Sequence, residues 1–269
     1  MEIVSKRDAL TIMLNLMDDI DAICNKYNLQ YFLAYGTLIG AVRHKGIIPW
    51  DDDMDIMMPR GDYEKFIQIY EKEGQYSITS PCSKNPLYYF AKIYNKNTIK
   101  KEKGISYKKF TPLGVDVDIF PLDNYLGLPT NNLVKNKWIF RMLYFFRGFA
   151  IDRITTQKSR KYPILSYLLG VLSHIVGNKI VMIIYERIAK HNNLKKSNLL
   201  TVYSGMENLS IFNKSDFSSY LVFPFEDRKY RIPIGYDNIL KAIYGDYMKL
   251  PPKEMQKSHH LNVIFWRNK

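Results

Sequence analysis

The chain of 269 residues has only two cysteines, Cys24 and Cys82, and five histidines. Because no spacing among them is typical of a zinc knuckle, the sequence predicts neither a structural zinc site nor a disulfide framework. We expect both cysteines to be inert thiols. The adjacent His259 and His260 have no third His or Cys at ligand spacing, so a structural or pocket-lining role is expected for them rather than metal binding.

Long uninterrupted apolar runs are also lacking. The N-terminus carries charges among its first residues and has no apolar run followed by a small-residue cleavage site, so no signal peptide is predicted. The most apolar stretch, residues 164–189, is interrupted by His174, Asn178 and Lys179. Neither part reaches the roughly 20 apolar residues that a membrane span needs. We therefore expect a cytoplasmic protein in which this stretch forms core helices or a helix on a membrane surface.

Acidic residues are few relative to basic ones, since 26 Asp and Glu stand against 39 Lys and Arg, a formal net charge of +13. A basic surface favours anionic partners such as nucleotides, nucleic acid or the anionic face of a membrane. The hydrophobic content of 46% and the charged content of 24% are ordinary for a globular protein and argue against wholesale disorder. The length suits one large domain or two small ones.

Helix and strand patterns alternate over the first half of the chain. Apolar residues at helical spacing over residues 5–27 predict an amphipathic helix. The aromatic run 31–35 ends at Gly36 and Thr37, which is typical of a buried strand entering a tight turn. A helix over residues 38–44 would follow, with Thr37 near its N-cap. Later patterns predict a helix at 62–70 and strands at 53–58, 88–94 and 115–120. This alternation is typical of an α/β or α+β domain.

An acidic cluster occupies one of the predicted strands. Asp51, Asp53 and Asp55 are spaced two apart, so in an extended strand they project from one face, while Asp52 points to the other. Carboxylates this close repel one another and raise each other's pKa values. A divalent cation removes that conflict and takes oxygen ligands in return. The segment therefore predicts a site for Mg²⁺ or Mn²⁺.

A second strand repeats the pattern with Asp116 and Asp118, and Asp118 is flanked by Val117 and Ile119. A solvated acidic loop is the alternative interpretation. However, these acids alternate with apolar residues in strands that look buried, and buried charges need partners or metals. The metal site is therefore the favoured interpretation.

The segment Gly36–Gly46 lies next to the acidic cluster and has features of a phosphate-binding turn. Gly36 permits close backbone approach, and the N–H groups of a helix starting near Thr37 would bind a phosphate. Arg43, His44 and Lys45 add positive charge. The glycine spacing matches neither the P-loop nor the dinucleotide-binding fingerprint. Its significance comes from its place between a strand and the carboxylate strand.

This order of elements resembles the nucleotidyltransferase fold, in which a Gly-Ser/Thr turn precedes an Asp-x-Asp strand and a third acid lies on a later strand. More narrowly, YFLAYGTLIGAVRHKGIIPWDDDMDIMMPRGDYEKF at 31–66 resembles the signature of the LicD family of phosphocholine transferases, relatives of fukutin and the fukutin-related protein. Three further blocks agree: FAKIYNKNT at 90–98, GVDVDIFPLD at 114–123 and IPIGYDNILKAIYGDYMKLPP at 232–252. The resemblance implies an α+β fold with a nucleotidyltransferase-like mixed β-sheet core, flanking helices and a helical subdomain.

The resemblance also implies roles for individual residues. Asp53 and Asp55 would be the metal-binding pair, Asp118 the third carboxylate and Asp51 a possible helper, with Mg²⁺ or Mn²⁺ as cofactor. Asp116 falls where the family pattern has no acid, so no role is carried over to it. CDP-choline would be the donor, a sugar hydroxyl the acceptor and CMP the leaving group. The acceptor would be a cell-surface glycan precursor of teichoic acid or lipopolysaccharide type.

Several residues near these motifs are candidates for binding the substrates. Choline carries a quaternary ammonium, which proteins bind with aromatic faces and carboxylates. Nearby aromatic residues could supply such faces, although core packing is the favoured interpretation for any single one. The predicted substrate-binding set is Gly36, Thr37, Arg43, His44, Lys45, Trp50, Tyr89 and Lys92.

We predict a catalytic core at 1–125, a basic and apolar helical subdomain at 126–200, and a segment at 201–269 that completes the core and donor pocket. If the acceptor is polyprenyl-linked, residues 133–190 would dock the enzyme peripherally at the inner face of the membrane. A helical subdomain that simply covers the core is an equal alternative.

Three other functions are compatible with parts of this pattern. A nucleotidyltransferase acting on RNA or a small molecule is compatible with the fold and the acids. However, the basic residues are scattered and no RNA-binding module is evident, so a nucleic-acid partner is not expected. Transfer of another alcohol phosphate, such as ribitol phosphate, also fits the resemblance. A catalytically dead binding protein does not fit the intact acids Asp53, Asp55 and Asp118.

Overall fold

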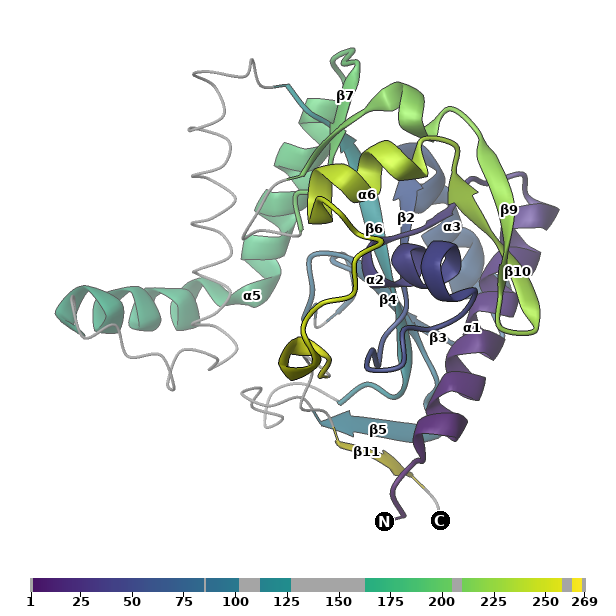
Figure 1. Cartoon of the computed structure of the whole chain (residues 1–269). Helices are drawn as coiled ribbons and strands as arrows, with labels where there is room; N and C mark the ends of the chain where they lie inside the picture. The colour runs from purple at the N-terminus through teal and green to yellow at the C-terminus, as the bar shows by residue number, and fades with distance from the viewer. Residues whose placement is uncertain are drawn as a thin grey trace.

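The computed structural model describes residues 2–84, 86–101, 112–126, 163–204, 210–257 and 263–267. Over these ranges the chain forms a mixed β-sheet with helices packed against it, which confirms the predicted α+β class (Figure 1). His259, His260 and most of the predicted helical segment before residue 163 lie outside the described residues. The division into three parts stays a prediction.

The main sheet has the strand order β1-β2-β6-β4-β3, with β7 paired to the end of β6 and β8 paired to β7. Strands β2 and β6 are parallel, whereas the other neighbouring strands are antiparallel. The bounds are β1 Phe32–Leu33, β2 Asp55–Pro59, β3 Ser77–Thr79, β4 Ala91–Tyr94, β6 Asp116–Asn124, β7 Leu199–Thr201 and β8 Ile211–Asn213. The parallel pair β2–β6 is central, so side chains at its ends are well placed to share one site.

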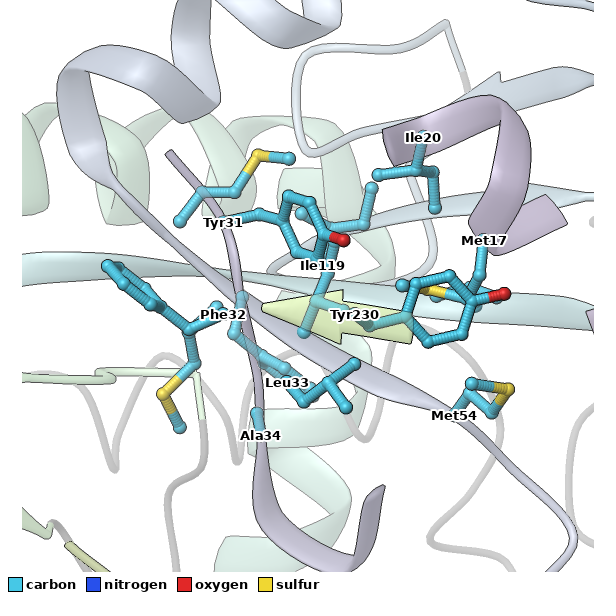
Figure 2. Close-up of a cluster of buried hydrophobic side chains, with 14 of the residues drawn as sticks. Met17, Ile20, Tyr31, Phe32, Leu33, Ala34, Met54, Ile119 and Tyr230 are labelled. Atoms are coloured by element: carbon cyan, nitrogen blue, oxygen red, sulfur yellow. The ribbon is translucent and has the colours of Figure 1, made fainter. Parts of the chain in front are cut away.

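The long first helix, α1 (Lys6–Lys26), confirms the predicted amphipathic helix. It begins after Ser5, whose hydroxyl accepts the N–H of Asp8 at 3.1 Å and so caps the first turn. Its apolar face carries Met17 and Ile20 into the core, where residues of β1, β6 and β10 meet them (Figure 2). This packing anchors the sheet behind the acidic segment.

Other elements surround the sheet. Helix α3 (Arg60–Glu73) follows β2 directly and is longer than the predicted helix. Strands β9 (Tyr220–Phe225) and β10 (Arg228–Pro233) form a hairpin, followed by α6 (Tyr236–Tyr244). Strand β5 (Thr98–Lys101) pairs with β11 (Val263–Trp266). A β-bridge between Ile3 and Phe265 of β11 brings the two ends of the chain together (Figure 1).

The helix predicted over residues 38–44 begins earlier than expected. It consists of α2 (Tyr35–Ile39) and a π-helical turn, η1 (Gly40–His44). Its N-cap is Ala34, not Thr37. Thr37 is buried inside the helix, where its hydroxyl accepts the backbone N–H of Asp55 at 2.8 Å. The interaction with β2 takes Thr37 away from the capping position and makes it part of the support of the acidic segment.

The apolar, basic segment forms α5 (Pro163–Asn193), which bends at Gly177, where φ is 74° (Figure 1). Among the described residues, no helix has the length and apolar character needed to cross a membrane. The second half of α5 packs Met182, Tyr185 and Ala189 against the body of the protein. Arg60 of α3 also pairs with Glu186 of α5 at 3.0 Å, so this part of α5 is tied to the sheet.

Candidate active site

The carboxylates of β2 and β6 meet at the centre of the sheet. The parallel register places Asp55 directly beside Asp118. Neighbouring residues in register project from the same face of a sheet, so these two carboxylates share a face. The Thr37 hydroxyl fixes the backbone of Asp55. Residues far apart in the sequence are thereby brought together on one rigid support.

The remaining acids precede β2. Asp51, Asp52 and Asp53 lie outside the strand, which corrects the prediction that the strand extends over residues 53–58. One carboxylate oxygen from each of the three lies within 4.8 Å of the others. Asp52 therefore belongs to this cluster and does not point away from it, because the loop frees the segment from the alternation of a strand.

Gly36 leaves room for this acidic loop. A Cβ atom at Gly36 would lie 2.4 Å from Oδ2 of Asp51, closer than any ordinary contact. The absence of a side chain at Gly36 therefore makes room for the Asp51 carboxylate, and its predicted contact with a phosphate stays a prediction.

Burial, and after it the charges of neighbouring acids, raise the pKa values of three of these carboxyl groups. Burial, followed by the charges of Asp53, Asp118 and Asp51, raises the pKa of Asp55 well above its usual range. Burial and the neighbouring Asp53 raise the pKa of Asp51 to about 7. Burial raises the pKa of Asp118 to about 6 despite the opposing charge of Lys92. Such a set of oxygen ligands fits a divalent cation, because the cation would stabilise all the ionised forms together.

The shift of Asp51 predicts a pH-dependent cost to stability in the metal-free protein. The folded state holds the proton of Asp51 up to about pH 7, whereas an unfolded chain releases it near 3.8. Stability therefore falls as pH rises through this interval. Urea denaturation of wild type and Asp51→Asn should show a stability difference in favour of the variant that grows from about pH 4 to about pH 7. A difference that is constant over this interval would contradict the shift.

Two lysines balance part of the negative charge from the side of β4 and β5. The Lys92 ammonium donates to Asp116 at 2.7 Å and to Asp118 at 2.5 Å, and Lys100 also pairs with Asp116. Burial opposes ionisation of Asp116, but Lys100 and Lys92 outweigh it and hold the pKa of Asp116 below its usual range. Asp116, to which the sequence assigned no role, therefore positions Lys92 beside Asp118.

The basic residues of the 36–46 segment differ in their surroundings. Arg43 donates to the backbone carbonyl of Tyr247 at 2.6 Å and, more weakly, to that of Lys249 at 3.4 Å. It therefore holds the chain after α6 against η1, a role that the sequence did not predict. The ring of His44 meets that of Trp50 edge to face, with centroids 6.0 Å apart. Lys45 has an exposed side chain.

Tyr89 does not join the carboxylates, which corrects its prediction as a substrate-binding residue. Its side chain is 1% exposed, and its ring packs against Tyr185 of α5 with centroids 4.4 Å apart. The rings that approach Lys92 are instead those of Tyr88 and Phe90, at 4.4 and 5.4 Å from the ammonium. Residues 88–90 precede β4 and do not continue it, so the strand alternation used to place Tyr89 does not hold there.

Two tyrosines near the acids were missed by sequence reasoning. Tyr35 and Tyr244 interact electrostatically with Asp55 and with each other. Tyr35 directly precedes the Gly-Thr turn, and this position in the sequence could have predicted that it lies near the acids. Tyr244 lies some two hundred positions away from the acids, and only the packing of α6 against α2 brings it near.

The mixed sheet, the Asp-x-Asp segment after a Gly-Thr turn and the third carboxylate on the adjacent strand define a nucleotidyltransferase-type domain. Residues 28–151 match a family model described as "LicD/FKTN/FKRP, nucleotidyltransferase domain". The chain is also 30% identical over 278 aligned positions to the lipopolysaccharide cholinephosphotransferase LicD of Haemophilus influenzae, covering 98% of this chain and 99% of that protein. The chain therefore belongs to the LicD family.

Shorter matches are found in two Rickettsia species. An uncharacterised protein of Rickettsia typhi is 46% identical over 66 residues, which is 24% of this chain and 21% of that protein. A second, of Rickettsia prowazekii, is 41% identical over 76 residues, or 28% of each chain. These matches carry no information on activity.

Proposed function

We propose that this protein is a phosphocholine transferase that moves phosphocholine from CDP-choline to a sugar hydroxyl of a cell-surface glycan precursor and releases CMP. The observation that carries the proposal is the full-length similarity to a lipopolysaccharide cholinephosphotransferase, together with the carboxylates that β2 and β6 place side by side. The acceptor would be a precursor of lipopolysaccharide or teichoic acid.

We assign the metal site to Asp53, Asp55 and Asp118, with Asp51 as a further ligand, and Mg²⁺ or Mn²⁺ as the ion. When bound, the cation would supply charge neutralisation for the diphosphate of the donor and for departing CMP. The raised pKa values of Asp55, Asp51 and Asp118 support this assignment, because acids that repel one another gain most from a shared cation.

In the reaction, the oxygen of the sugar hydroxyl forms a bond to the phosphorus of phosphocholine, and the bond from that phosphorus to the oxygen of CMP breaks. Asp118 is our candidate for the base that takes the hydroxyl proton. In the metal-free site the pKa of Asp118 is about 6, above that of an ordinary carboxylate, which favours this role. The alternative role is that Asp118 shares the cation and does not take the proton. Lys92, held by Asp116, donates to Asp118 at 2.5 Å, and an ammonium in this place would also attract a phosphate group of the donor.

Release of CMP tests the proposal. The protein is incubated with CDP-choline, Mg²⁺ and a candidate glycan, with and without a chelator. We expect CMP and phosphocholine-modified glycan in equal amounts, and neither product in the presence of the chelator. Consumption of a nucleoside triphosphate with release of pyrophosphate, and no reaction of CDP-choline, would overturn the proposal in favour of nucleotidyl transfer.

The close contact at Gly36 gives a further prediction. In Gly36→Ala the new methyl group would displace the Asp51 carboxylate, which lies 2.4 Å from it. Because small misplacements of reacting groups are costly, we expect the transfer rate to fall by about tenfold to a hundredfold. The matched control is Gly61→Ala, where a Cβ meets nothing within 4 Å and the rate should not change. A rate for Gly36→Ala equal to that of the control would show that this contact has no catalytic importance.

We also propose that α5 contacts the membrane at its inner, anionic face, where a polyprenyl-linked acceptor would be presented. Among the α5 side chains that the structure describes, five apolar ones are exposed, and basic side chains are exposed among them. An exposed helix face with both characters binds anionic bilayers through apolar insertion and attraction to the head groups. The apolar residues are Leu172, Ile175, Ile180, Ile183 and Ile184, and the basic ones are Lys179, Arg187 and Lys190.

Vesicle flotation tests the contact with the membrane. We expect wild-type protein to float with vesicles that contain anionic lipid and not with neutral ones, and binding to be lost in Ile180→Ser combined with Ile183→Ser. Val222→Ser, a change of an equally exposed apolar residue on β9, serves as the control. Binding that is unaffected by the α5 changes, or no binding to anionic vesicles, would show that α5 does not dock the protein.

A further inference from the structure

We propose that Tyr35 and Tyr244, together with Phe120, form the surface that recognises the quaternary ammonium of choline. This inference rests on the proposed function and adds the residues that would determine specificity for the donor. The observation behind it is the position of these three aromatic side chains at the edge of the carboxylate cluster.

Tyr35 is held in an unusual conformation next to the acids. It is the first residue of α2, and its φ of 46° lies in the left-handed region, which a bulky side chain rarely adopts. Its ring meets Phe120 of β6 edge to face, with centroids 5.3 Å apart, and Phe120 lies two residues after Asp118 on the same strand. Backbone strain of this kind is commonly retained where it serves a site.

Tyr244 approaches from the other side. It is the last residue of α6, which packs against α2, and the segment after it is held by the hydrogen bonds from Arg43 to the carbonyls of Tyr247 and Lys249. Its side chain is 44% exposed. The end of α6 therefore brings a partly exposed ring toward α2, whose first residue is Tyr35.

These features match the chemistry of choline. A trimethylammonium group has no N–H to donate, so it is bound by the faces of aromatic rings and by nearby negative charge. With the phosphorus of the donor at the carboxylates, the two-carbon linker of choline would bring its ammonium to an immediately adjacent surface. The surface formed by Tyr35, Tyr244 and Phe120 lies next to the carboxylates and consists of aromatic rings, the groups that bind a trimethylammonium.

The experiment compares two donors that differ in this group alone, CDP-choline and CDP-ethanolamine. Donor affinity is measured by titration calorimetry and kcat/KM by CMP release, for wild type, Tyr244→Ala, Tyr244→Phe and Tyr35→Leu. We expect Tyr244→Ala and Tyr35→Leu each to lower the choline-to-ethanolamine preference by about tenfold, the scale of one desolvated cation–π contact. Tyr244→Phe should keep the preference, because the ring and not the hydroxyl makes the contact.

Tyr220→Ala is the matched control, because Tyr220 is 43% exposed but lies on β9, where its ring faces Arg231. It should retain the wild-type preference. If wild type uses CDP-choline and both Tyr244→Ala and Tyr35→Leu keep the full preference with normal folding, the inference is wrong while the proposed function stands. If wild type neither binds nor uses CDP-choline, the proposed function fails, and this inference fails with it.

Discussion

Replacing Asp55 with Asn is expected to lower the rate of phosphocholine transfer by about a thousandfold or more, the scale of charge-stabilising groups in phosphoryl transfer. Asp55 lies at the centre of the site, beside Asp118 on the parallel strand, and its backbone is held by Thr37. The change keeps the shape of the side chain and removes its charge. CMP release at saturating Mg²⁺ and CDP-choline measures the effect.

The same variant should fold at least as well as wild type in the absence of metal. Burial and three neighbouring acids make ionised Asp55 unfavourable in the folded protein, so a neutral amide relieves repulsion. A loss of activity without a loss of stability would separate a catalytic role from a structural one. The exposed Asp227, paired with Arg228 on the surface, provides the control Asp227→Asn. Equal rates for Asp55→Asn and this control would contradict the proposed site.

Replacing Arg60 with Leu is expected to be the most destabilising single change predicted here, lowering the free energy of unfolding by about 3–5 kcal/mol. Arg60 is 6% exposed and donates two hydrogen bonds of 2.7 Å to Asp123, which is fully buried, and one of 3.0 Å to Glu186. Its removal leaves two buried carboxylates without their cation. Urea denaturation followed by circular dichroism measures the loss.

Two further variants test whether the loss in Arg60→Leu comes from the buried charges. Lys26→Leu removes an ion pair of similar length to Glu73, but both side chains are well exposed, so little change is expected because water already screens such pairs. Glu186→Gln in the Arg60→Leu background should recover part of the loss, because it removes one of the uncompensated charges. An unfolding free energy for Arg60→Leu within about 1 kcal/mol of wild type would contradict the importance of the buried network.

Much of this architecture was predictable because the pattern of apolar residues carries it. The amphipathic helix α1 followed from its spacing alone, and its start matched the capping residue Ser5. The strand that carries Asp118 was predicted from alternation, and the register then placed it beside Asp55. Local periodicity and the order of motifs are both properties of short stretches, so a sequence displays them directly.

Other features depended on contacts between distant segments and had no local signal. The pattern gave no sign that the Arg43 guanidinium would bind the carbonyl of Tyr247, some two hundred residues later. Tyr89 was expected at the site, but the arrival of α5 buries it against Tyr185. Thr37 was predicted to lie near a helix N-cap because it follows Gly36. In the structure its hydroxyl instead accepts the backbone N–H of Asp55. Where a side chain has several possible partners, the tertiary structure decides which of them it binds.

Phosphocholine transfer is distinguished from nucleotidyl transfer by following the two halves of the donor separately. CDP-choline labelled in the choline methyl groups and CDP-choline labelled in cytidine are incubated in parallel with the protein, Mg²⁺ and a glycan acceptor. We expect the choline label to appear on the glycan while the cytidine label remains in free CMP, and Asp55→Asn to abolish both results. Cytidine label on the acceptor, or choline transfer that persists in Asp55→Asn, would contradict it.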